Sequence, residues 1–474
     1  MKIVVLVKVV DGEINPFDAS AVEWALSVEN GEVTLLSMGP RAWEGVLLPL
    51  TRLGVRRAIL LSDPVFAGSD TLATAYVLSR ALARLDCDLI LAGRKTLDGE
   101  TGQVGPCLAS MLRIPVLTNV FSFATGDGEI VAETALGTER AKLPACLTLE
   151  RTKQLRFPSL FSTTGEVEIW DNGTVGADPA RCGLPGSPTK VIGTFESKKG
   201  ERSCKRIAPT DLLPLLRELR AKQKRKVEPV PSEKKLPAVW VVGEEALDAA
   251  KAIAEKVIVI EKDSPEAIAK RAKIGRPDVI LWCADVWGRR NAPIVQAILG
   301  TGLCADCTDL ETDGRRLTMI RPAKGGNITA KILCDTLPQM ATVRTAEKAA
   351  DDLIVSAGRG VADEINTVRE FARRLGAGFC ASRALVDLGG ADYPEQVGLT
   401  GRVVRPKIYL AIGISGAVQH LVGMRDADVV IAINPDPAAP IFGFADYGIV
   451  GSFDDFYRDV SEQFPEGDKI YAGL

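Results

Sequence analysis

Histidine occurs only once in the 474 residues, at His420, and the ten cysteines are scattered along the chain. No second pair of cysteine or histidine residues stands at zinc-ligand spacing beside Cys304 and Cys307, so we expect no zinc site. Cysteines without a compact framework also argue against disulfides and favour free thiols in a reducing compartment. The sequence therefore predicts a cytoplasmic protein without metal or disulfides.

Long apolar runs and a large excess of one charge are also missing. No uncharged stretch approaches the roughly 20 residues that span a bilayer. The apolar start at residues 2–9 is interrupted by Lys8 and has no small-residue cleavage site, so we expect a first buried strand. The net charge of -3 gives no general attraction to nucleic acid. We expect a soluble protein that reaches a membrane only through a partner.

Short β-branched strands alternate with helical patterns, which is typical of a parallel sheet with crossover helices. In the first part of the chain the expected strands are 2–9, 33–38, 57–61 and 88–92, with a helix at 70–85. Further strands are expected at 238–242, 257–260, 353–356, 408–412 and 429–433. At about 150 residues a domain, the length suggests three units. The sequence therefore predicts an α/β protein with three doubly wound parallel-sheet units.

Composition divides the chain into four segments. Residues 191–236 are rich in lysine and contain several prolines, which predicts an exposed, basic linker. This linker separates a first unit at 1–190 from a second at 237–350, and the third unit is expected at 351–474. We expect the linker to be a solvated tether and not an anion site.

The first two units contain a weak internal repeat. Residues 88–94 resemble residues 278–284, and each stretch is followed by a small-residue turn, a proline (Pro106 or Pro293) and a helix. The turn at 97–105 carries several glycines, whereas its counterpart at 286–291 carries one. If either copy binds a nucleotide, the first copy is therefore expected to do so.

Three strand-to-loop junctions in the last unit have the composition of a dinucleotide site. Arg359 lies between two glycines at the first junction, where a strand meets a helix and a phosphate can be paired. At the second, the strand 408–412 runs into Gly-Ile-Ser-Gly-Ala-Val-Gln-His at 413–420, which places His420 on the first turns of a helix. At the third, Asn434 ends a strand with an amide that suits a phosphate or a sugar.

Four motifs follow one another in this region. They are Gln-Val-Gly-Leu-Thr-Gly at 396–401, the stretch 413–420, Ala-Ile-Asn-Pro-Asp-Pro-Ala-Ala-Pro-Ile-Phe at 432–442, and Ala-Asp-Tyr-Gly at 445–448. In this order they resemble the C-terminal FAD domain of the electron-transfer flavoprotein alpha subunit. The resemblance implies that the last unit is an FAD-binding domain.

The resemblance also implies a set of FAD contacts. These are Arg359, Ser382, Arg383, Gln396, Val397, Gly398, Thr400, Ser415, Gly416, Ala417, Val418, Gln419, His420 and Asn434. Three of them would tune the flavin: Arg383 by its positive charge, Thr400 at N5 and His420 at the O2 edge. A lone histidine is more often structural, but the surrounding motifs favour a flavin role for His420.

Motifs in the N-terminal half resemble the beta subunit of the same family. They lie at 14–18, 67–74, 93–106 and 183–189, so the chain is similar to the two subunits fused into one polypeptide. In that family the beta subunit binds either a structural AMP or a second FAD. The implied contacts are Asn15, Asp18, Asp98, Gly99, Thr101, Gln103, Val104 and Gly105. The motif at 98–106 is more similar to flavin-bifurcating members, which favours FAD and leaves AMP open.

The function that the resemblance implies is electron transfer. The chain would accept electrons on FAD from a dehydrogenase of the acyl-CoA dehydrogenase type and pass them to an acceptor such as a quinone oxidoreductase, ferredoxin or flavodoxin. Family members dock the dehydrogenase with a loop in the beta subunit, and its leucine anchor corresponds to Leu160.

Two other functions stay open at this point. The first is an electron-bifurcating enzyme that oxidises NADH on a second FAD near residues 98–105. The second is a non-redox sensor or adaptor that binds nucleotides on the same α/β units. The flavin content of the purified chain separates the three functions, because the simple carrier holds one FAD, the bifurcating enzyme two and the sensor none.

Overall fold

A computed structural model of the chain describes residues 1–196, 202–221, 232, 234–323, 328–344, 352–398, 401–402, 404–425 and 427–461. These residues form two compact units. Unit 1 contains the described residues of 1–196 and 228–345 apart from the short stretch 325–327, and unit 2 combines 202–221 with 352–461. Within this part of the chain, no helix has both the length and the apolar character needed to cross a membrane.

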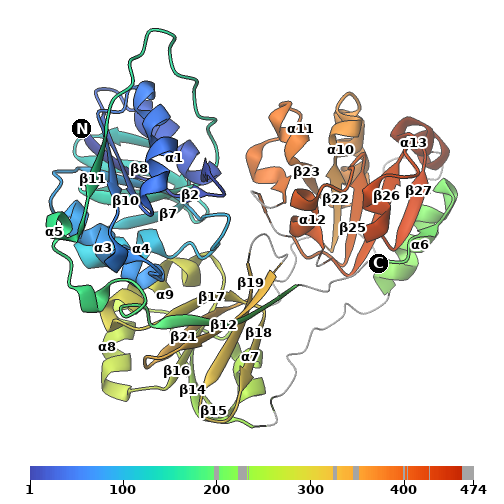
Figure 1. Ribbon diagram of the computed structural model, residues 1–474. Helices are drawn as coiled ribbons and strands as arrows, with labels where there is room; N and C mark the ends of the chain where they lie inside the picture. The colour runs from blue at the N-terminus through green and yellow to red at the C-terminus, as the bar shows by residue number, and fades with distance from the viewer. Residues whose placement is uncertain are drawn as a thin grey trace. The chain divides into compact units, whose positions relative to one another are not determined.

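The first sheet of unit 1 has nine strands in the order β11-β5-β4-β1-β6-β10-β7-β8-β9 (Figure 1). Its strands are β11 (Val167–Trp170), β5 (Arg57–Leu61), β4 (Glu32–Met38), β1 (Lys2–Leu6), β6 (Leu89–Gly93), β10 (Ala145–Leu149), β7 (Val116–Gly126), β8 (Glu129–Thr134) and β9 (Gly137–Lys142). All pairs are parallel except β7 with β8 and β8 with β9. Connecting helices are α1 (Pro16–Leu26), α2 (Glu44–Leu47), α3 (Thr71–Leu82), α4 (Val104–Leu112) and α5 (Asn172–Val175), and β2 (Val9–Val10) pairs with β3 (Glu13–Ile14).

The second sheet of unit 1 repeats this plan with five parallel strands in the order β15-β14-β16-β21-β17. They are β15 (Ala254–Ile260), β14 (Leu236–Val242), β16 (Val279–Cys283), β21 (Gln339–Val343) and β17 (Leu303–Cys307), with helices α7 (Leu247–Ile253), α8 (Pro265–Gly275) and α9 (Val286–Leu299). In both sheets the first strand of the chain pairs with the next strand on one side (β4 or β15) and with the strand after the reversal on the other (β6 or β16), so β14 corresponds to β1 and β16 to β6. The repeat expected from residues 88–94 and 278–284 therefore extends over the whole five-stranded sheet.

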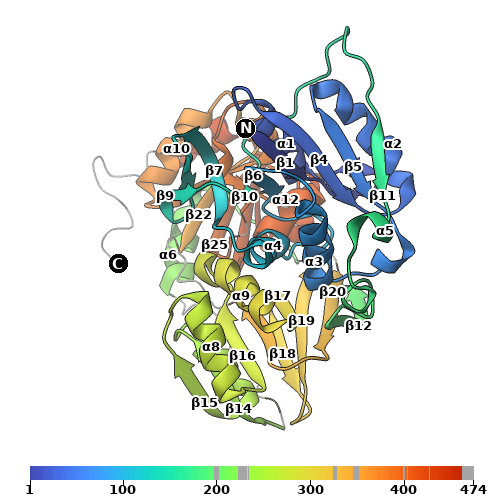
Figure 2. The same ribbon diagram turned by 90° about the vertical axis from the view of Figure 1, so that its left-hand side faces the viewer.

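Helices α4 and α9, which occupy equivalent positions in the two copies, lie side by side in Figures 1 and 2. A hydrogen bond of 3.4 Å from Ser110 Oγ to Ile294 O joins them, and Cys107 and Gln296 face each other in the buried part of the contact. The parts expected as separate units at 1–190 and 237–350 thus share one compact unit, because the two crossover helices bury their apolar faces against each other.

A small antiparallel sheet completes unit 1, in the order β12-β20-β19-β18. Its strands are β12 (Thr189–Glu196), β20 (Ile328–Cys334), β19 (Leu317–Ala323) and β18 (Asp309–Thr312). Strand β12 follows the first copy in the sequence but pairs with β20 of the second copy. It therefore adds a second connection between the copies.

Unit 2 is built on seven parallel strands in the order β13-β27-β26-β25-β22-β23-β24. They are β13 (Lys205–Arg206), β27 (Tyr447–Val450), β26 (Val429–Asn434), β25 (Ile408–Ile412), β22 (Leu353–Ala357), β23 (Gly378–Ser382) and β24 (Gln396–Val397). The helices are α6 (Leu212–Ala221), α10 (Ile365–Arg374), α11 (Arg383–Asp387), α12 (Val418–Met424) and α13 (Phe453–Ser461). The doubly wound α/β class predicted from the sequence is confirmed.

Part of the segment predicted to be an exposed linker is folded. Residues 189–196 form β12, and 205–206 form β13 at the edge of unit 2 beside β27. Helix α6 buries Leu212, Leu213, Leu216 and Leu219 in the same core as α10 and α13. The lysines and prolines that suggested a tether lie mostly at 222–235, and leucines at i, i+3 and i+4 spacing are the stronger signal at 212–219.

We expect Leu216→Ala to destabilise unit 2 by about 3 kcal/mol, because Leu216 is fully buried and its truncation leaves a cavity. Arg217→Ala, one residue further on the exposed side of α6, is the matched control and should change the free energy of unfolding by less than about 0.5 kcal/mol. Pulse proteolysis in urea, read on peptides from unit 2, measures both. Equal midpoints for the two variants would mean that α6 does not stabilise unit 2.

Candidate functional site

The sheet of unit 2 reverses its winding between β22 and β25. The chain passes from β22 to β23 and β24 on one side and then returns to β25 on the other side of β22. In open parallel sheets, ligands bind outside the carboxyl ends of the strands at such a reversal. Its two flanking loops, 358–361 and 413–417, contain the first two junctions predicted from the sequence.

These two loops touch through their backbones. The Gly358 N–H donates to Ile412 O at 2.7 Å, and the Gly360 N–H donates to Gly413 O at 3.1 Å. A Cβ on Gly358 would lie 2.0 Å from Gly413 O, so no larger residue fits there without moving the second loop. These two N–H groups are used between the loops, and the close approach brings both loops together at the carboxyl edge of the sheet, where a dinucleotide can bind.

Most of the other predicted contacts surround the same edge. Ser382 ends β23 and its Oγ caps α11 by accepting from Leu385 N at 3.4 Å. Arg383, next to it, is half exposed and lies 3.3 Å from Asp387. The exposed residues at this edge are Arg359, Ser415, Ala417, Val418 and Gln419, and the buried ones are Gln396, Val397 and Gly416. The exposed set has the positions from which a bound dinucleotide can be contacted.

The end of β24 packs tightly on α12. Gly398 has a φ of 139°, and a Cβ on it would lie 2.7 Å from Gln419 O. A Cβ on Gly423 of α12 would lie 2.3 Å from the backbone N of Gly398. Thr400, which the resemblance places at flavin N5, lies outside the described residues. Two glycines therefore bring β24 against the helix that carries His420.

His420 is buried, with 6% of its surface exposed. Its Nε2 lies 2.9 Å from Oη of Tyr409, a fully buried residue of β25. Among the described residues its Nδ1 has no hydrogen bond of normal geometry. Burial lowers the pKa of the imidazole to about 4, and a contact with the Val397 backbone opposes this only partly. His420 is therefore neutral at pH 7, and its contact with the flavin O2 edge stays a prediction.

Asn434 fixes the third junction. Its Nδ2 donates to Ile414 O at 3.0 Å, and its Oδ1 accepts from Asp436 N at 2.9 Å. The amide thus ties the end of β26 to the loop after β25. A remaining N–H is the part of this side chain that can reach a phosphate or a sugar.

A second reversal lies in the first sheet of unit 1, between β1 and β6. Asp18 joins the two strand ends by accepting from Lys8 N at 2.8 Å and from Gly93 N at 3.0 Å. Burial raises the pKa of this carboxyl to about 7, although hydrogen bonds from Lys8, Asn15 and Gly93 counteract it. Asp18 therefore supports the site by holding the two strand ends. Each of its carboxylate oxygens already accepts a backbone hydrogen bond, so the carboxylate is not free to bind a ligand through both.

The glycine-bearing loop 93–105 lies at this reversal and is held there by side-chain contacts. Asn15 Nδ2 donates to Lys95 O at 3.0 Å, and Lys8 Nζ lies 2.5 Å from Asp98 Oδ2. Burial would raise the pKa of Asp98, but hydrogen bonds from Lys8 and Thr96 outweigh it and lower that pKa. Asp98 is therefore ionised, with Lys8 as its counter-charge.

The end of this loop leads directly into α4. Gly102 has a φ of 63°, and a Cβ on Gly105 would lie 2.4 Å from Thr148 Cγ2. Gln103 is the N-cap residue of α4, but its side chain does not bond to the helix, so the first N–H groups of α4 have no side-chain partner at the cap. Together with Gly99, Thr101 and Val104, these N–H groups lie where the resemblance implies a second nucleotide.

Gln103 itself is turned away from the loop. Its Oε1 accepts from Thr71 at 2.7 Å and its Nε2 donates to Leu303 O at 3.2 Å, so the amide connects the two copies of unit 1. This geometry gives Gln103 a structural role. The sequence did not separate it from the ligand-facing residues because it lies inside the same motif.

Two cations at this site were not predicted. Lys8 forms the ion pair with Asp98, and Lys95 is mostly buried, which lowers its pKa to about 8. The interruption of the apolar strand by Lys8 was a usable signal, since a charged residue at a buried strand end needs a partner.

The equivalent reversal in the second copy also carries an ion-pair cluster. Lys262 lies 2.5 Å from Glu245 and 3.2 Å from Asp285, and the Trp287 ring is 5.3 Å from its Nζ. The two copies differ at the helix start: Asp285 caps α9 by accepting from Gly288 N at 2.6 Å, whereas no side chain caps α4. This contrast supports the expectation that the first copy, and not the second, binds a nucleotide.

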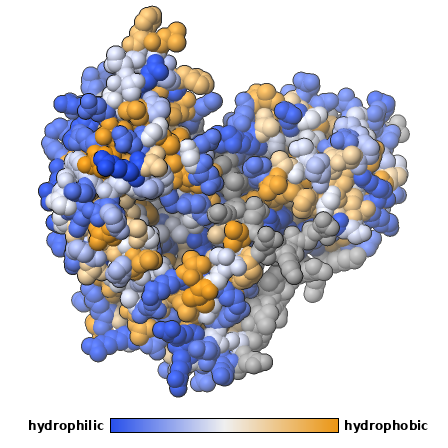
Figure 3. Space-filling model, in the orientation of Figure 1, coloured by the Kyte–Doolittle hydropathy of each residue, from blue (hydrophilic) through white to orange (hydrophobic). Residues whose placement is uncertain are grey.

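The loop at 151–166 exposes apolar side chains at its tip (Figure 3). Leu160, the predicted docking anchor, is 92% exposed, between Phe157 at 90% and Phe161 at 95%. Arg156 holds the base of the loop through an ion pair of 2.8 Å with Glu23. Single exposed apolar residues are common on protein surfaces, but here three large ones lie together at one loop tip. Such a cluster is typical of an interaction site.

The buried imidazole makes unit 2 sensitive to acid. The unfolded chain protonates His420 near pH 6.5 and the folded chain only near pH 4, so stability is lost as the pH falls. Between pH 7.5 and pH 5 we expect His420 to account for about 2 kcal/mol of this loss. His420→Gln should remove that part, whereas Tyr409→Phe, which keeps the imidazole, should retain it. Pulse proteolysis at both pH values measures it, and identical losses in wild type and His420→Gln would contradict the assignment.

Comparison with known proteins identifies the family of the chain. The family model described as the electron transfer flavoprotein domain matches residues 3–152 and 234–369, and that of the electron transfer flavoprotein FAD-binding domain matches 348–425. The chain is 43% identical over 232 residues to an electron transfer flavoprotein subunit alpha of Thermoanaerobacterium thermosaccharolyticum, which covers 39% of this chain and 70% of that protein.

Two further relatives match a similar length. Protein FixB of Clostridium saccharobutylicum is 38% identical, over 42% of this chain and 72% of its own. The lactate dehydrogenase (NAD(+),ferredoxin) subunit LctC of Acetobacterium woodii is 39% identical, over 40% of this chain and 55% of its own. The first family model covers both halves of the chain, and the second covers the reversal at β22 and β25. The chain therefore belongs to the electron transfer flavoprotein family, with an FAD-binding domain in its C-terminal part.

Proposed function

We propose that the chain carries electrons on FAD held at the carboxyl edge of the sheet in unit 2. The donor is a dehydrogenase of the acyl-CoA dehydrogenase type, and the acceptor is a redox partner such as a quinone oxidoreductase, ferredoxin or flavodoxin. The observation that supports this most strongly is the contact of the Gly358 and Gly413 loops at the reversal, inside the part that the FAD-domain model matches.

The residues around that edge have separate tasks in this proposal. The loop 413–419, together with Arg359 and Asn434, holds the dinucleotide by backbone N–H groups, charge and amide. When bound, FAD supplies the ability to take up and release electrons singly or in pairs. Arg383 and Thr400 tune it through a positive charge and a hydroxyl, and His420 adds a neutral hydrogen-bonding group. Gln396, Val397 and Gly398 shape the wall that supports α12.

A second nucleotide, FAD or AMP, is proposed for the reversal between β1 and β6 under the loop 98–105. The Lys8 ammonium and the start of α4 suit its phosphates. A second FAD would make the chain a bifurcating enzyme that oxidises NADH. The relative LctC, a subunit of a lactate dehydrogenase named for NAD(+) and ferredoxin, supports this alternative.

We expect each nucleotide to depend on its own glycine loop. Gly358→Ala should reduce the FAD content to below a tenth, because the new Cβ meets the backbone of Gly413. Gly102→Ala should remove mainly the second nucleotide, because Gly102 has a positive φ and a Cβ there lies 3.1 Å from Arg94 O. The visible spectrum and chromatography of the released FAD and AMP measure both contents.

Gly443→Ala and Gly126→Ala are the controls for these variants, since a Cβ at either position meets nothing within 4 Å. Two FAD per wild-type chain favour the bifurcating enzyme, and one FAD with one AMP favours the simple carrier. If the Gly358→Ala variant keeps both nucleotides, the proposed FAD site is contradicted.

We also expect Leu160→Ala to slow electron uptake from an acyl-CoA dehydrogenase at least tenfold, because an exposed apolar anchor is lost. Leu136→Ala, at another exposed loop, is the control. The rate of flavin reduction at limiting dehydrogenase concentration measures the effect, while the visible spectrum of both variants should stay unchanged. Equal rates for the two variants would exclude Leu160 as the anchor for this donor.

A further inference from the structure

The two copies in unit 1 create two equivalent places at the ends of α4 and α9. Both helices end at a residue with positive φ, Arg113 at 58° and Gly300 at 67°. In both, the residue that follows donates its backbone N–H to a carbonyl of the last helical turn. Ile114 N donates to Ala109 O at 3.1 Å, and Thr301 N donates to Gln296 O at 3.2 Å. Each helix end therefore lies at the same point of its copy, just before strand β7 or β17.

At the end of α9 the chain itself fills this place. Ser187 Oγ accepts from Asp70 N at 2.8 Å, and Thr189 Oγ1 donates to Asp70 Oδ2 at 2.7 Å, so the segment 187–189 is fixed to the N-terminus of α3. The same segment lies against Gly302, where a Cβ would be 2.8 Å from Thr189 Cγ2. A short stretch that continues as strand β12 thus lies against both the N-terminus of α3 and the residue that follows the end of α9.

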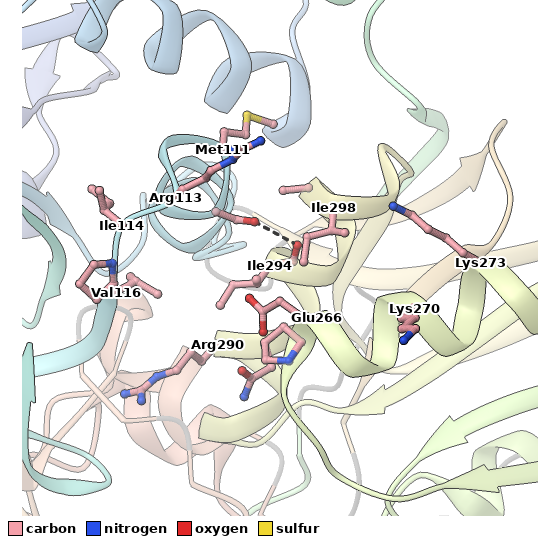
Figure 4. Close-up of a pocket in the computed structure, with 15 residues that line it drawn as sticks. Met111, Arg113, Ile114, Val116, Glu266, Lys270, Lys273, Arg290, Ile294 and Ile298 are labelled. Atoms are coloured by element: carbon pink, nitrogen blue, oxygen red, sulfur yellow. Dashed lines mark hydrogen bonds between the residues drawn. The ribbon is translucent and has the colours of Figure 1, made fainter.

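At the end of α4 the equivalent place is an open groove of about 920 Å³ (Figure 4). Helix α8, the counterpart of α3 in the second copy, lines one side of the groove with Pro265, Glu266, Lys270 and Lys273. Ile294 and Ile298 of α9 lie between the two sides and, with Met111, Ile114 and Val116, give the groove an apolar floor. These apolar side chains remain partly exposed. No described residue covers the groove as 187–189 covers its counterpart.

The rim of the groove is positively charged. Arg113 from the α4 side and Lys270 and Lys273 from α8 are exposed, whereas Glu266 is the one acidic residue that lines the groove. Arg290 is neutralised by an ion pair of 2.6 Å with Glu139. The groove therefore has an excess of two positive charges beside an apolar floor.

We propose that this groove binds an extended, acidic segment of a partner protein. The extended form follows from segment 187–189, which covers the equivalent place in the other copy. The acidic character follows from the three exposed cations at the rim, and the apolar floor adds affinity for one or two apolar residues of the segment. The groove lies at the end of α4 opposite to the glycine loop, so it anchors the partner without blocking the nucleotide site.

The probe is a random eight-residue peptide library displayed on phage and selected on the full chain. We expect enrichment of peptides that combine acidic with apolar residues. Arg113→Glu/Lys270→Glu/Lys273→Glu should weaken a selected peptide at least tenfold in fluorescence anisotropy. Arg80→Glu/Lys251→Glu/Lys256→Glu, which changes the net charge equally at exposed sites elsewhere, should weaken it less than twofold. Salt should weaken binding to the wild type, because exposed ion pairs are screened.

Glu266→Lys provides a second test that does not remove a wild-type cation, and it should strengthen binding of the same peptide. Selection of basic or uncharged peptides, or equal binding to the two triple variants, would overturn the proposal. Sedimentation that shows a wild-type dimer dissociated by the groove variant would assign the groove to a second copy of this chain and would also overturn it.

Discussion

The structure depends on one topological constraint, the return of the chain to the far side of the strand at which each winding began. In the three α/β sheets these strands are β1, β14 and β22, and the strand after the reversal, β6, β16 or β25, pairs with the other edge of each. Parallel strands present their carboxyl ends at one edge, so the loops on either side of the reversal begin close together. What distinguishes the three sheets is what occupies that edge: touching glycine loops in unit 2, a glycine-bearing loop before the uncapped α4 in the first copy, and the Asp285 cap of α9 in the second.

The sequence predicted the features that depend on local pattern. The strands at 57–61 and 408–412 have the expected bounds, and both glycine loops lie at reversals. A short apolar run or a glycine turn carries its own signal. Leucine spacing in 212–219 was a local signal too, but the lysines and prolines around it concealed it.

The contacts that the sequence did not reveal are those between distant residues. His420 faces Tyr409 from the next helix, Asp98 faces Lys8 across 90 positions, and Gln103 reaches Leu303 across 200. Nothing in the neighbourhood of these residues specifies a partner, because each contact exists only when strands and helices from different parts of the chain are in place. Motif resemblance therefore indicates where the candidate sites lie, but the direction of each side chain needs the fold.

Helix α6 has a consequence for the synthesis of the chain. It leaves the ribosome about 130 residues before β22, the first strand after α6 in the sheet that buries its leucines. At roughly 5–20 residues a second, these leucines wait on the order of 10 seconds or longer for their partners. During this interval the nascent chain exposes the apolar face of α6 with no core to pack against. We expect the chain to need a chaperone most at this stage.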